Sequence, residues 1–172
     1  TIPHKENVSA SRGILTDRNG KVMVGNKTVY TLTFDSSSFS TNEEINDAIL
    51  RLLHLLESYD LAWEDTLPIG FNSPSYLTDA VSPTYLSRFS EYLINRKVQT
   101  RELTEANPTP DIPCSTLVRR LREEYKIPED MDYADARKIL GVRYELTLRN
   151  CVPLSNYVFI EDAKSDDLSA IM

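Results

Sequence analysis

Hydrophobic residues recur every three to four positions in four stretches of the chain, which is the spacing of an amphipathic helix. Thr41 and Glu44 precede the clearest stretch at the spacing of a capping box, in which each residue caps the backbone of the other. Ser82-Pro83 marks a second helix start, because serine caps helices and proline suits their first turn. The predicted helices cover residues 45–57, 83–97, 115–126 and 132–148.

Alternating apolar and polar residues predict short strands near both ends of the chain. Residues 12–35 have the pattern of an antiparallel meander, in which Asn19-Gly20 is a strong signal for a hairpin turn. Within it, residues 29–34 carry an apolar side chain at every second position, and the helix over 45–57 is the expected cover for that face. Residues 157–160 are a further strand candidate.

The order of these elements predicts an α+β fold, in which a small antiparallel sheet is packed with several α-helices. A chain of 172 residues is long enough for one domain with its own core. We predict a single domain over residues 1–172 that contains a mainly helical insertion over residues 36–150. A capped helix start at Ser165 lies seven residues before the end, which we expect of a piece of a longer protein.

The charge balance narrows the possible partners. The chain carries 26 acidic and 19 basic residues, which gives a net charge of −7. A surface of this sign repels phosphate backbones, so we expect no nucleic-acid partner. No apolar run reaches the ~18 residues that a membrane span requires, so any attachment to a membrane is expected outside this chain.

Candidate catalytic side chains are few. His4 and His54 lack the spacing of a zinc site, so no metal is predicted. With 5 glycines and no phosphate-binding motif, no cofactor is predicted either. Cys114 and Cys151 fit two unrelated thiols or one disulfide. A Cys–His nucleophile or a carboxylate pair, brought together by the fold, stays open as a hydrolase alternative.

The densest basic cluster consists of Arg119, Arg120 and Arg122, with Glu123 and Glu124 beside it. On a helix these side chains spread around the surface, which favours a solvated face with ion pairs over an anion-binding site. Both interpretations stay open for this cluster.

One motif is more specific than the overall pattern. Residues 12–20 have the sequence RGILTDRNG, and KVMVGN follows over residues 21–26. This stretch resembles the motif that opens the non-catalytic domain of class B penicillin-binding proteins. Arg143-Tyr144-Glu145, and a strand over residues 157–162 after it, fit the order of elements in the same family.

The same resemblance extends to Glu64–Ile69, whose sequence EDTLPI is similar to a shorter motif of some family members. No family motif is recognised over residues 70–113. The resemblance therefore covers both ends of the chain and the general shape of its middle.

The resemblance implies that this chain is the domain that is often called the dimerisation or pedestal domain. Its parent would be a monofunctional transpeptidase that crosslinks peptidoglycan outside the cytoplasmic membrane. We predict that this chain lacks the catalytic set Ser-x-x-Lys, Ser-x-Asn and Lys-Thr-Gly. No serine is followed by a lysine three residues later, and Lys27-Thr28 is followed by Val29. The chain is therefore predicted not to be an enzyme, with a membrane anchor before it and the transpeptidase domain after it.

The predicted site is a structural motif and not a catalytic or ligand site. Its glycines and asparagines suit turns and close approach, and its arginines and aspartate suit bidentate pairs that clamp one segment against another. A simple charged hairpin on the surface is the alternative. The residues assigned to the motif are Arg12, Gly13, Asp17, Arg18, Asn19, Gly20, Asn26, Arg143 and Glu161.

The expected function is to position the transpeptidase domain and to mediate protein contacts in cell-wall synthesis. The expected partner is the chain's own transpeptidase domain, with a second copy or other proteins of wall synthesis left open. The expected location is the extracytoplasmic face of the bacterial cytoplasmic membrane. A free-standing interaction module is the main alternative, and a small hydrolase is a third.

Overall fold

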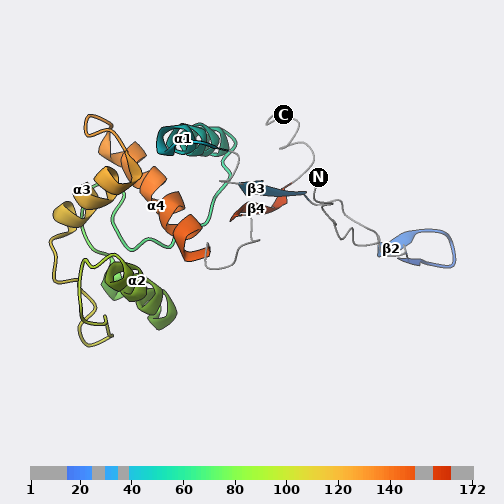
Figure 1. The fold of residues 1–172 in the computed structure, drawn as a ribbon. Helices are drawn as coiled ribbons and strands as arrows, with labels where there is room; N and C mark the ends of the chain where they lie inside the picture. The colour runs from blue at the N-terminus through green and yellow to red at the C-terminus, as the bar shows by residue number, and fades with distance from the viewer. Residues whose placement is uncertain (1–14, 25–29, 35–38, 150–156, 164–172) are drawn as a thin grey trace, which may run out of the picture. The chain divides into compact units, whose positions relative to one another are not determined.

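A computed structural model describes residues 15–24, 30–34, 39–149 and 157–163 (Figure 1). The chain forms two compact units, one of residues 1–30 with 162–172 and one of residues 31–161. The described residues of the larger unit form four α-helices, which are α1 (Asn42–Ser58), α2 (Pro83–Asn95), α3 (Cys114–Tyr125) and α4 (Tyr133–Arg149). A short 3-10 helix, η2, spans Thr78–Ala80.

The four predicted helices are confirmed, and two of them begin where the capping signals placed them. Thr41 and Glu44 form the capping box of α1, in which Thr41 Oγ1 accepts from the Glu44 N–H at 3.2 Å. Ser82 caps α2 by accepting from the Tyr85 N–H at 3.5 Å, and Pro83 occupies the first turn. These side chains satisfy backbone N–H groups that the helix itself leaves without partners.

Each of the helices α1, α2 and α3 is followed, within two residues of its end, by a residue other than glycine with a left-handed backbone. These residues are Asp60, Lys97 and Lys126, with φ angles of 55°, 55° and 56°. In each case the following N–H reaches back to a carbonyl of the last turn, which is the bond of a Schellman motif. The bonds join Leu61 to Leu56 (2.9 Å), Val98 to Leu93 (3.0 Å) and Ile127 to Arg122 (2.9 Å).

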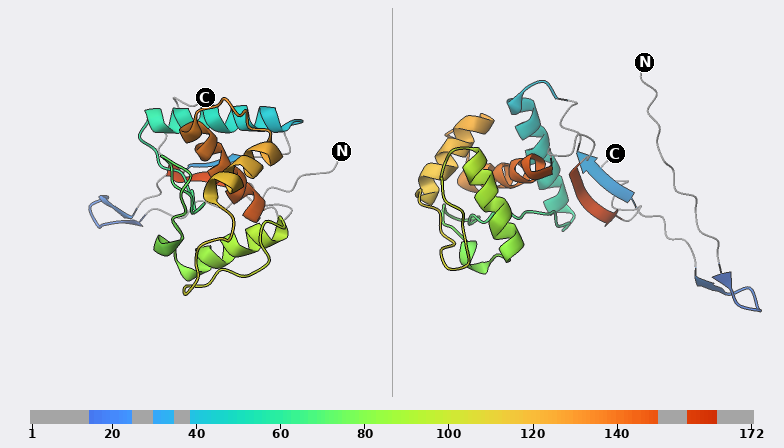
Figure 2. Two further views of the ribbon diagram at one scale, coloured as in Figure 1. Left: turned by 90° about the vertical axis from the view of Figure 1, so that its left-hand side faces the viewer. Right: turned by 60° about the horizontal axis from the view of Figure 1, so that its bottom comes forward.

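Helix α4 lies at the centre of the larger unit, with α1 on one side and α2 on the other (Figure 2). It is buried on every side between Ala136 and Leu146, which is typical of a helix enclosed by others. Tyr144 lies edge-on to Phe89 and Tyr92 of α2, with ring centroids 6.1 and 4.7 Å away. Full burial of one such large apolar side chain contributes about 1.5–3 kcal/mol.

The strands form two separate pairs. β1 (Leu15–Thr16) pairs with β2 (Val22–Val24), and β3 (Tyr30–Phe34) pairs with β4 (Tyr157–Ala163). The predicted α+β fold, with one small antiparallel sheet packed with the helices, is wrong: the described part of the chain is helical and contains no such sheet. The physical reason is that the apolar faces of the helices pack against other helices and not against a sheet.

The apolar stripe of α1 shows where the fold prediction failed. Ile49, Leu53 and Leu56 are fully buried, and α1 packs chiefly against α4. Helix α1, which was predicted to cover the strand over residues 29–34, therefore packs mainly against another helix. The helix start expected at Ser165 lies outside the described residues. Within the described ranges, no helix combines the length and hydrophobicity needed to cross a bilayer.

Candidate functional site

The turn of the RGILTDRNG motif is held by Asp17. Its Oδ1 accepts from the N–H groups of Asn19 and Lys21, both at 2.8 Å, and its backbone N–H donates to the Lys21 carbonyl at 2.8 Å. Gly20 takes a φ of +82°, which favours glycine at this position. Arg18 is exposed beside this turn. Arg12, Gly13 and Asn26 lie outside the described residues, so the clamp proposed for this motif stays a prediction.

Arg143 joins three helices from a buried position, 7% exposed. Its Nε and Nη2 donate to Asn46 Oδ1 at 3.0 and 2.8 Å, and Nη2 also donates to the Asn42 carbonyl at 2.9 Å. The amide of Asn46 donates in turn to the Tyr125 carbonyl at the end of α3, at 2.9 Å. Burial lowers the pKa of Arg143 from its ordinary value. Glu161, the other predicted residue in this half of the chain, lies in β4.

A different set of contacts holds a segment without helix or strand along α4. We call residues 64–70 the strap. Polar groups of the strap meet α4 at positions that recur every four residues, which places each contact position on the same face as the next one. The α4 positions are Tyr133, Arg137, Gly141, Glu145 and Arg149.

Arg137 is the centre of this arrangement and is 1% exposed. Its guanidinium binds the carboxylate of Asp65 through two bonds, Nη1–Oδ2 at 2.8 Å and Nη2–Oδ1 at 3.1 Å. It also donates to the carbonyls of Ile69 at 2.9 Å and Leu67 at 2.8 Å. The ring of Phe71 lies over the guanidinium with its centroid 4.3 Å from Cζ. A buried ion pair needs such additional bonds, because desolvation of both charges is expensive.

Gly141 gives the Asp65 carboxylate room to reach Arg137. A Cβ atom at this position would lie 2.7 Å from Asp65 Cγ and 2.8 Å from Arg137 Nη1, inside van der Waals contact. Glycine in the middle of a helix costs about 1 kcal/mol relative to alanine. The close approach explains why the helix contains glycine at this point.

The C-terminal half of α4 binds the start of the strap. Glu145 is 3% exposed, and its Oε1 accepts from the Thr66 N–H at 2.9 Å and from the Thr66 hydroxyl. Arg149 forms an ion pair with Glu64. Burial raises the pKa of Glu145, while the two bonds from Thr66 act in the opposite direction. At the other end of the strap, Tyr133 donates its hydroxyl to the Gly70 carbonyl at 2.8 Å.

A second polar cluster ties α2 to α3 and α4. Arg96 lies over the ring of Tyr92 with Cζ 3.8 Å from its centroid, and its Nη2 donates to the Tyr125 hydroxyl at 2.7 Å. Tyr125 is also within 3.1 Å of the Tyr92 hydroxyl and of Thr147 Oγ1. Burial raises the pKa of Tyr92 well above its ordinary value, so this phenol stays neutral.

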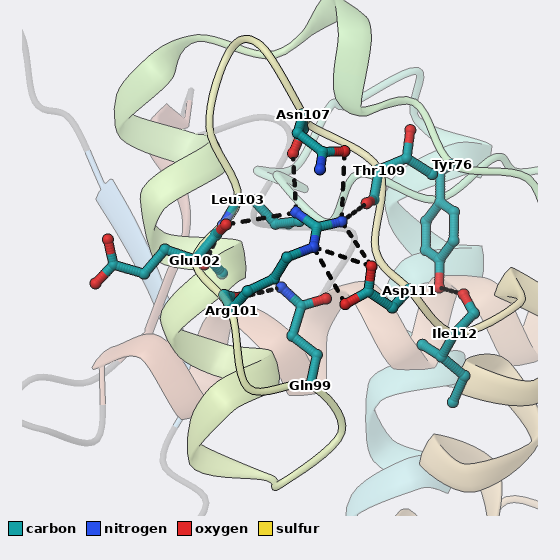
Figure 3. A network of polar contacts seen from close by, with 10 residues as sticks. Tyr76, Gln99, Arg101, Glu102, Leu103, Asn107, Thr109, Asp111 and Ile112 are labelled. Carbon is teal, nitrogen blue, oxygen red and sulfur yellow. Dashed lines mark hydrogen bonds and ion pairs between the residues drawn. The ribbon is translucent and has the colours of Figure 1, made fainter.

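The loop after α2 is organised by Arg101 (Figure 3). Its guanidinium binds both carboxylate oxygens of Asp111, with Nη2–Oδ1 at 2.8 Å and Nε–Oδ2 at 3.1 Å. It also donates to the carbonyls of Asn107 at 3.3 Å and Thr109 at 2.8 Å. Ser90 joins the loop to α2 by accepting from the Leu103 N–H at 2.8 Å. One arginine thus fixes a loop that has little regular structure.

The residues considered for chemistry serve other contacts where the structure describes them. Burial raises the pKa of the Cys114 thiol to about 11, which disfavours the reactive thiolate. His54 lies 3.1 Å from Asp135 on the surface between α1 and α4. Cys151 and His4 lie outside the described residues, and the described ranges contain no group of three or more His, Cys, Asp or Glu that could hold a metal ion.

Arg122 from the predicted basic cluster supports the turn after α3. Its Nη2 donates to the Met131 carbonyl at 2.9 Å and to the Pro128 carbonyl. Arg119 and Arg120 are exposed on the same helix. The prediction that the chain lacks Ser-x-Asn is wrong at the level of sequence, because Ser40-Thr41-Asn42 has this pattern. In the structure, Thr41 of this tripeptide is the N-cap of α1.

The pairing of Asp65 with Arg137 was missed by sequence reasoning. The only available signals were the EDTLPI stretch and the four-residue spacing of Arg137, Gly141, Glu145 and Arg149. The partners are more than 70 positions apart in the chain, so neither signal indicates the other.

The chain was compared with known proteins. A family model for the penicillin-binding protein dimerisation domain matches residues 7–145, which is well over half of the chain. No curated protein and no solved structure matched it. The matched range contains the RGILTDRNG motif, the strap and most of α4. The chain therefore belongs to the penicillin-binding protein dimerisation domain family, whose members are non-catalytic modules.

Proposed function

We infer that this chain is the N-terminal module of a class B penicillin-binding protein, where it positions the transpeptidase domain and makes protein contacts during peptidoglycan synthesis. It acts at the extracytoplasmic face of the bacterial cytoplasmic membrane, through an anchor outside this chain. The two compact units are then parts of one non-catalytic domain over residues 1–172, which contains a mainly helical insertion over residues 36–150. Its first partner is its own transpeptidase domain, and a second copy of the chain or other proteins of wall synthesis are the further partners left open.

The observation that carries this proposal is the family match over residues 7–145. The contacts of the strap with α4 support it, because a positioning module must hold its shape. Buried arginines are committed to structural bonds in the larger unit: Arg137 to the strap and Arg143 to α1. Side chains with such buried, directional bonds fix one arrangement of the elements that they join.

The parent reading frame offers a direct test. We expect the frame to continue beyond the codon for Met172 and to encode Ser-x-x-Lys, Ser-x-Asn and Lys-Thr-Gly. A stop codon directly after Met172 would reject the proposed parent enzyme and favour a free-standing interaction module. Fluorescent penicillin should leave this chain unlabelled, and a stoichiometric covalent adduct would reject the non-catalytic assignment.

The positioning role is tested in the full-length parent with Arg137→Ala. We expect the variant to bind penicillin covalently, because its transpeptidase domain is intact, but to fail to support growth when it is the only copy. Arg51→Ala is the matched control, since Arg51 belongs to an exposed ion pair on α1. Normal growth with Arg137→Ala, at normal protein level and with a disrupted module, would reject the positioning role.

A further inference from the structure

The tip of the hairpin between β1 and β2 carries an unprotected asparagine next to a glycine. Asn19 and Gly20 are both exposed, and no described residue bonds the side-chain amide of Asn19. A Cβ atom added to Gly20 would have no other atom within 4 Å, so the space beside its backbone is open. Asparagine is one of the thermolabile residues of proteins, and its side-chain reaction needs an unhindered backbone nitrogen in the next residue.

The chemistry that these features favour is a cyclisation within the chain. The backbone nitrogen of Gly20 loses its proton to water and forms a bond with Cγ of Asn19. The bond between Cγ and Nδ2 breaks, and this nitrogen takes a proton from water and leaves as ammonia. A succinimide ring remains, which water opens at either of its two carbonyls to give aspartate or isoaspartate. Water is the co-reactant, so the conversion needs neither an enzyme nor a cofactor.

Other asparagines lack one of these features. Asparagine is followed by glycine once in the sequence, at residues 19–20. Asn46 is buried, and both polar atoms of its side chain are hydrogen-bonded. Asn107 is followed by Pro108, which has no N–H to lose. Asn72 is the nearest comparison, because it is exposed, but the side chain of Ser73 crowds the nitrogen that would attack it.

The bonds of Asp17 keep the reacting groups apart while the turn is closed. The Gly20 N–H donates to the Asp17 carbonyl at 3.0 Å, so the lone pair that deprotonation frees points at an oxygen and not at Cγ of Asn19. The Asp17 carboxylate also accepts from the N–H groups of Asn19 and Lys21, both at 2.8 Å, which fixes the backbone on either side. Attack therefore requires the turn to open locally, which costs less than unfolding the whole chain.

We propose that Asn19 is a site of spontaneous deamidation through cyclisation with Gly20, and that the Asp17 side chain slows this reaction by holding the turn closed. The product adds a negative charge beside the Asp17 carboxylate, and isoaspartate also lengthens the main chain within the turn. The modification therefore alters the hairpin of β1 and β2 slowly and in one direction. The proposal goes beyond the proposed function and does not depend on it, so its failure leaves the positioning role standing.

Timed incubation of the purified chain at mildly alkaline pH, followed by proteolysis and mass spectrometry, locates the reaction. Trypsin is avoided, because Arg18 and Lys21 flank the site. We expect the mass gain of an asparagine-to-aspartate conversion at Asn19 before any other asparagine, with aspartate and isoaspartate products that separate by chromatography. Faster conversion at Asn72 or elsewhere, no conversion at Asn19, or a product without isoaspartate would overturn the proposal.

Asp17→Ala tests whether the closed turn controls the rate. The variant removes both bonds of the carboxylate, so conversion of Asn19 should become at least about threefold faster. Asp79→Ala is the matched control, because Asp79 is an exposed aspartate in η2, away from the hairpin. Circular dichroism verifies that the helices are intact in both variants. Equal rates in the wild type and Asp17→Ala, or the same acceleration in Asp79→Ala, would overturn the proposal.

Gly20→Ala tests whether the Gly20 nitrogen is the attacking group. In the folded chain this variant would also strain the turn, since Gly20 has a φ of +82°, so the comparison is made in urea, where no turn remains. There the wild type should convert Asn19 faster than the folded chain does, and Gly20→Ala should slow the conversion at least about threefold, because its Cβ crowds the nitrogen. Equal rates for the two unfolded chains, or a folded wild type as fast as the unfolded one, would overturn the proposal.

Discussion

The carboxylate of Asp65 occupies the space beside Gly141 that any other residue would fill with its own side chain. Asp65 belongs to the strap and Gly141 to the middle of α4, 76 positions later in the chain. A Cβ at position 141 would approach Asp65 Cγ to 2.7 Å. The ion pair of Asp65 with Arg137, one helical turn before Gly141, therefore depends on a residue that takes no part in it.

Gly141→Ala is expected to destabilise the chain by about 1–3 kcal/mol, the usual cost of overpacking a well-packed site. In an unhindered helix the same change would stabilise by about 1 kcal/mol. Urea unfolding followed by circular dichroism measures the difference in the free energy of unfolding.

The control for Gly141→Ala is the same substitution in an Asp65→Ala background, where the obstructing carboxylate is gone. There the change should be neutral or stabilising, and the coupling between the two positions should be large. A loss of stability from Gly141→Ala that is equal in both backgrounds would contradict the proposed steric conflict.

Arg137→Ala should lower the free energy of unfolding by about 3–5 kcal/mol, because it leaves the Asp65 carboxylate buried without its partner. Arg51→Ala is the comparison, since Arg51 and Asp47 form an ion pair with side chains 84% and 70% exposed. Exposed pairs contribute little, so this variant should unfold close to the wild-type midpoint. Equal losses in both variants would contradict the assigned role of burial.

Glu145 should make stability depend on pH in an unusual direction. Burial raises its pKa in the folded chain above the ordinary value of 4.5, so its ionisation opposes folding. Its favourable contribution is complete below pH 4.5 and is lost as the pH rises through the folded-state pKa. Glu145→Gln should therefore remove part of the loss of stability that the wild type shows above pH 4.5.

Asp135 provides the opposite case for that experiment. Hydrogen bonds from His54 and Lys138 lower its pKa below 3.8, with burial opposing them. Its contribution is present above pH 3.8 and is lost as the pH falls. Thermal melts of wild type, Glu145→Gln and Asp135→Asn across pH 3 to 7 should show difference curves of opposite slope. Curves of the same slope would reject the proposed direction for Glu145.

Lys97→Gly is expected to stabilise the chain by about 0.5–1 kcal/mol. Lys97 follows α2 with a φ of 55°, a backbone conformation that is strained for a residue with a Cβ atom and favourable for glycine. Glu91→Gly, on the exposed side of the same helix, should instead cost about 1 kcal/mol. Thermal unfolding distinguishes the two, and destabilisation by Lys97→Gly would contradict the assigned backbone strain.

The four helices could be predicted from the sequence because their signals are local. Thr41 and Glu44 lie three positions apart, and the apolar spacing of α1 shows which side it buries. The strap could not be predicted, because its bonds join Asp65 and Thr66 to residues more than 70 positions away and mostly involve backbone carbonyls or single side chains. Bonds to backbone carbonyls or to single side chains leave no periodic pattern in the sequence.

The sheet was predicted wrongly for a related reason. Alternation over residues 29–34 correctly indicated a strand, seen as β3, but it says nothing about what the strand packs against. Several helices with apolar stripes can cover one another, and α4 provides the surface on which they do so. Within the predicted motif, the turn that Asp17 and Gly20 form could be recognised from Asn19-Gly20 alone. The burial of Arg143, which extends from α4 to Asn46 of α1, could not be recognised from the sequence.

The four-residue interval of the strap contacts has a mechanical consequence. A helix turns by about 100° per residue, so each step of four residues advances the contact by about 40° around the axis. From Tyr133 to Arg149 the contacted positions of α4 therefore spread over roughly 160° of the helix circumference. Rotation of α4 about its own axis would stretch the contacts of Tyr133 and Arg149 with the strap at the same time. The strap therefore resists rotation of this helix.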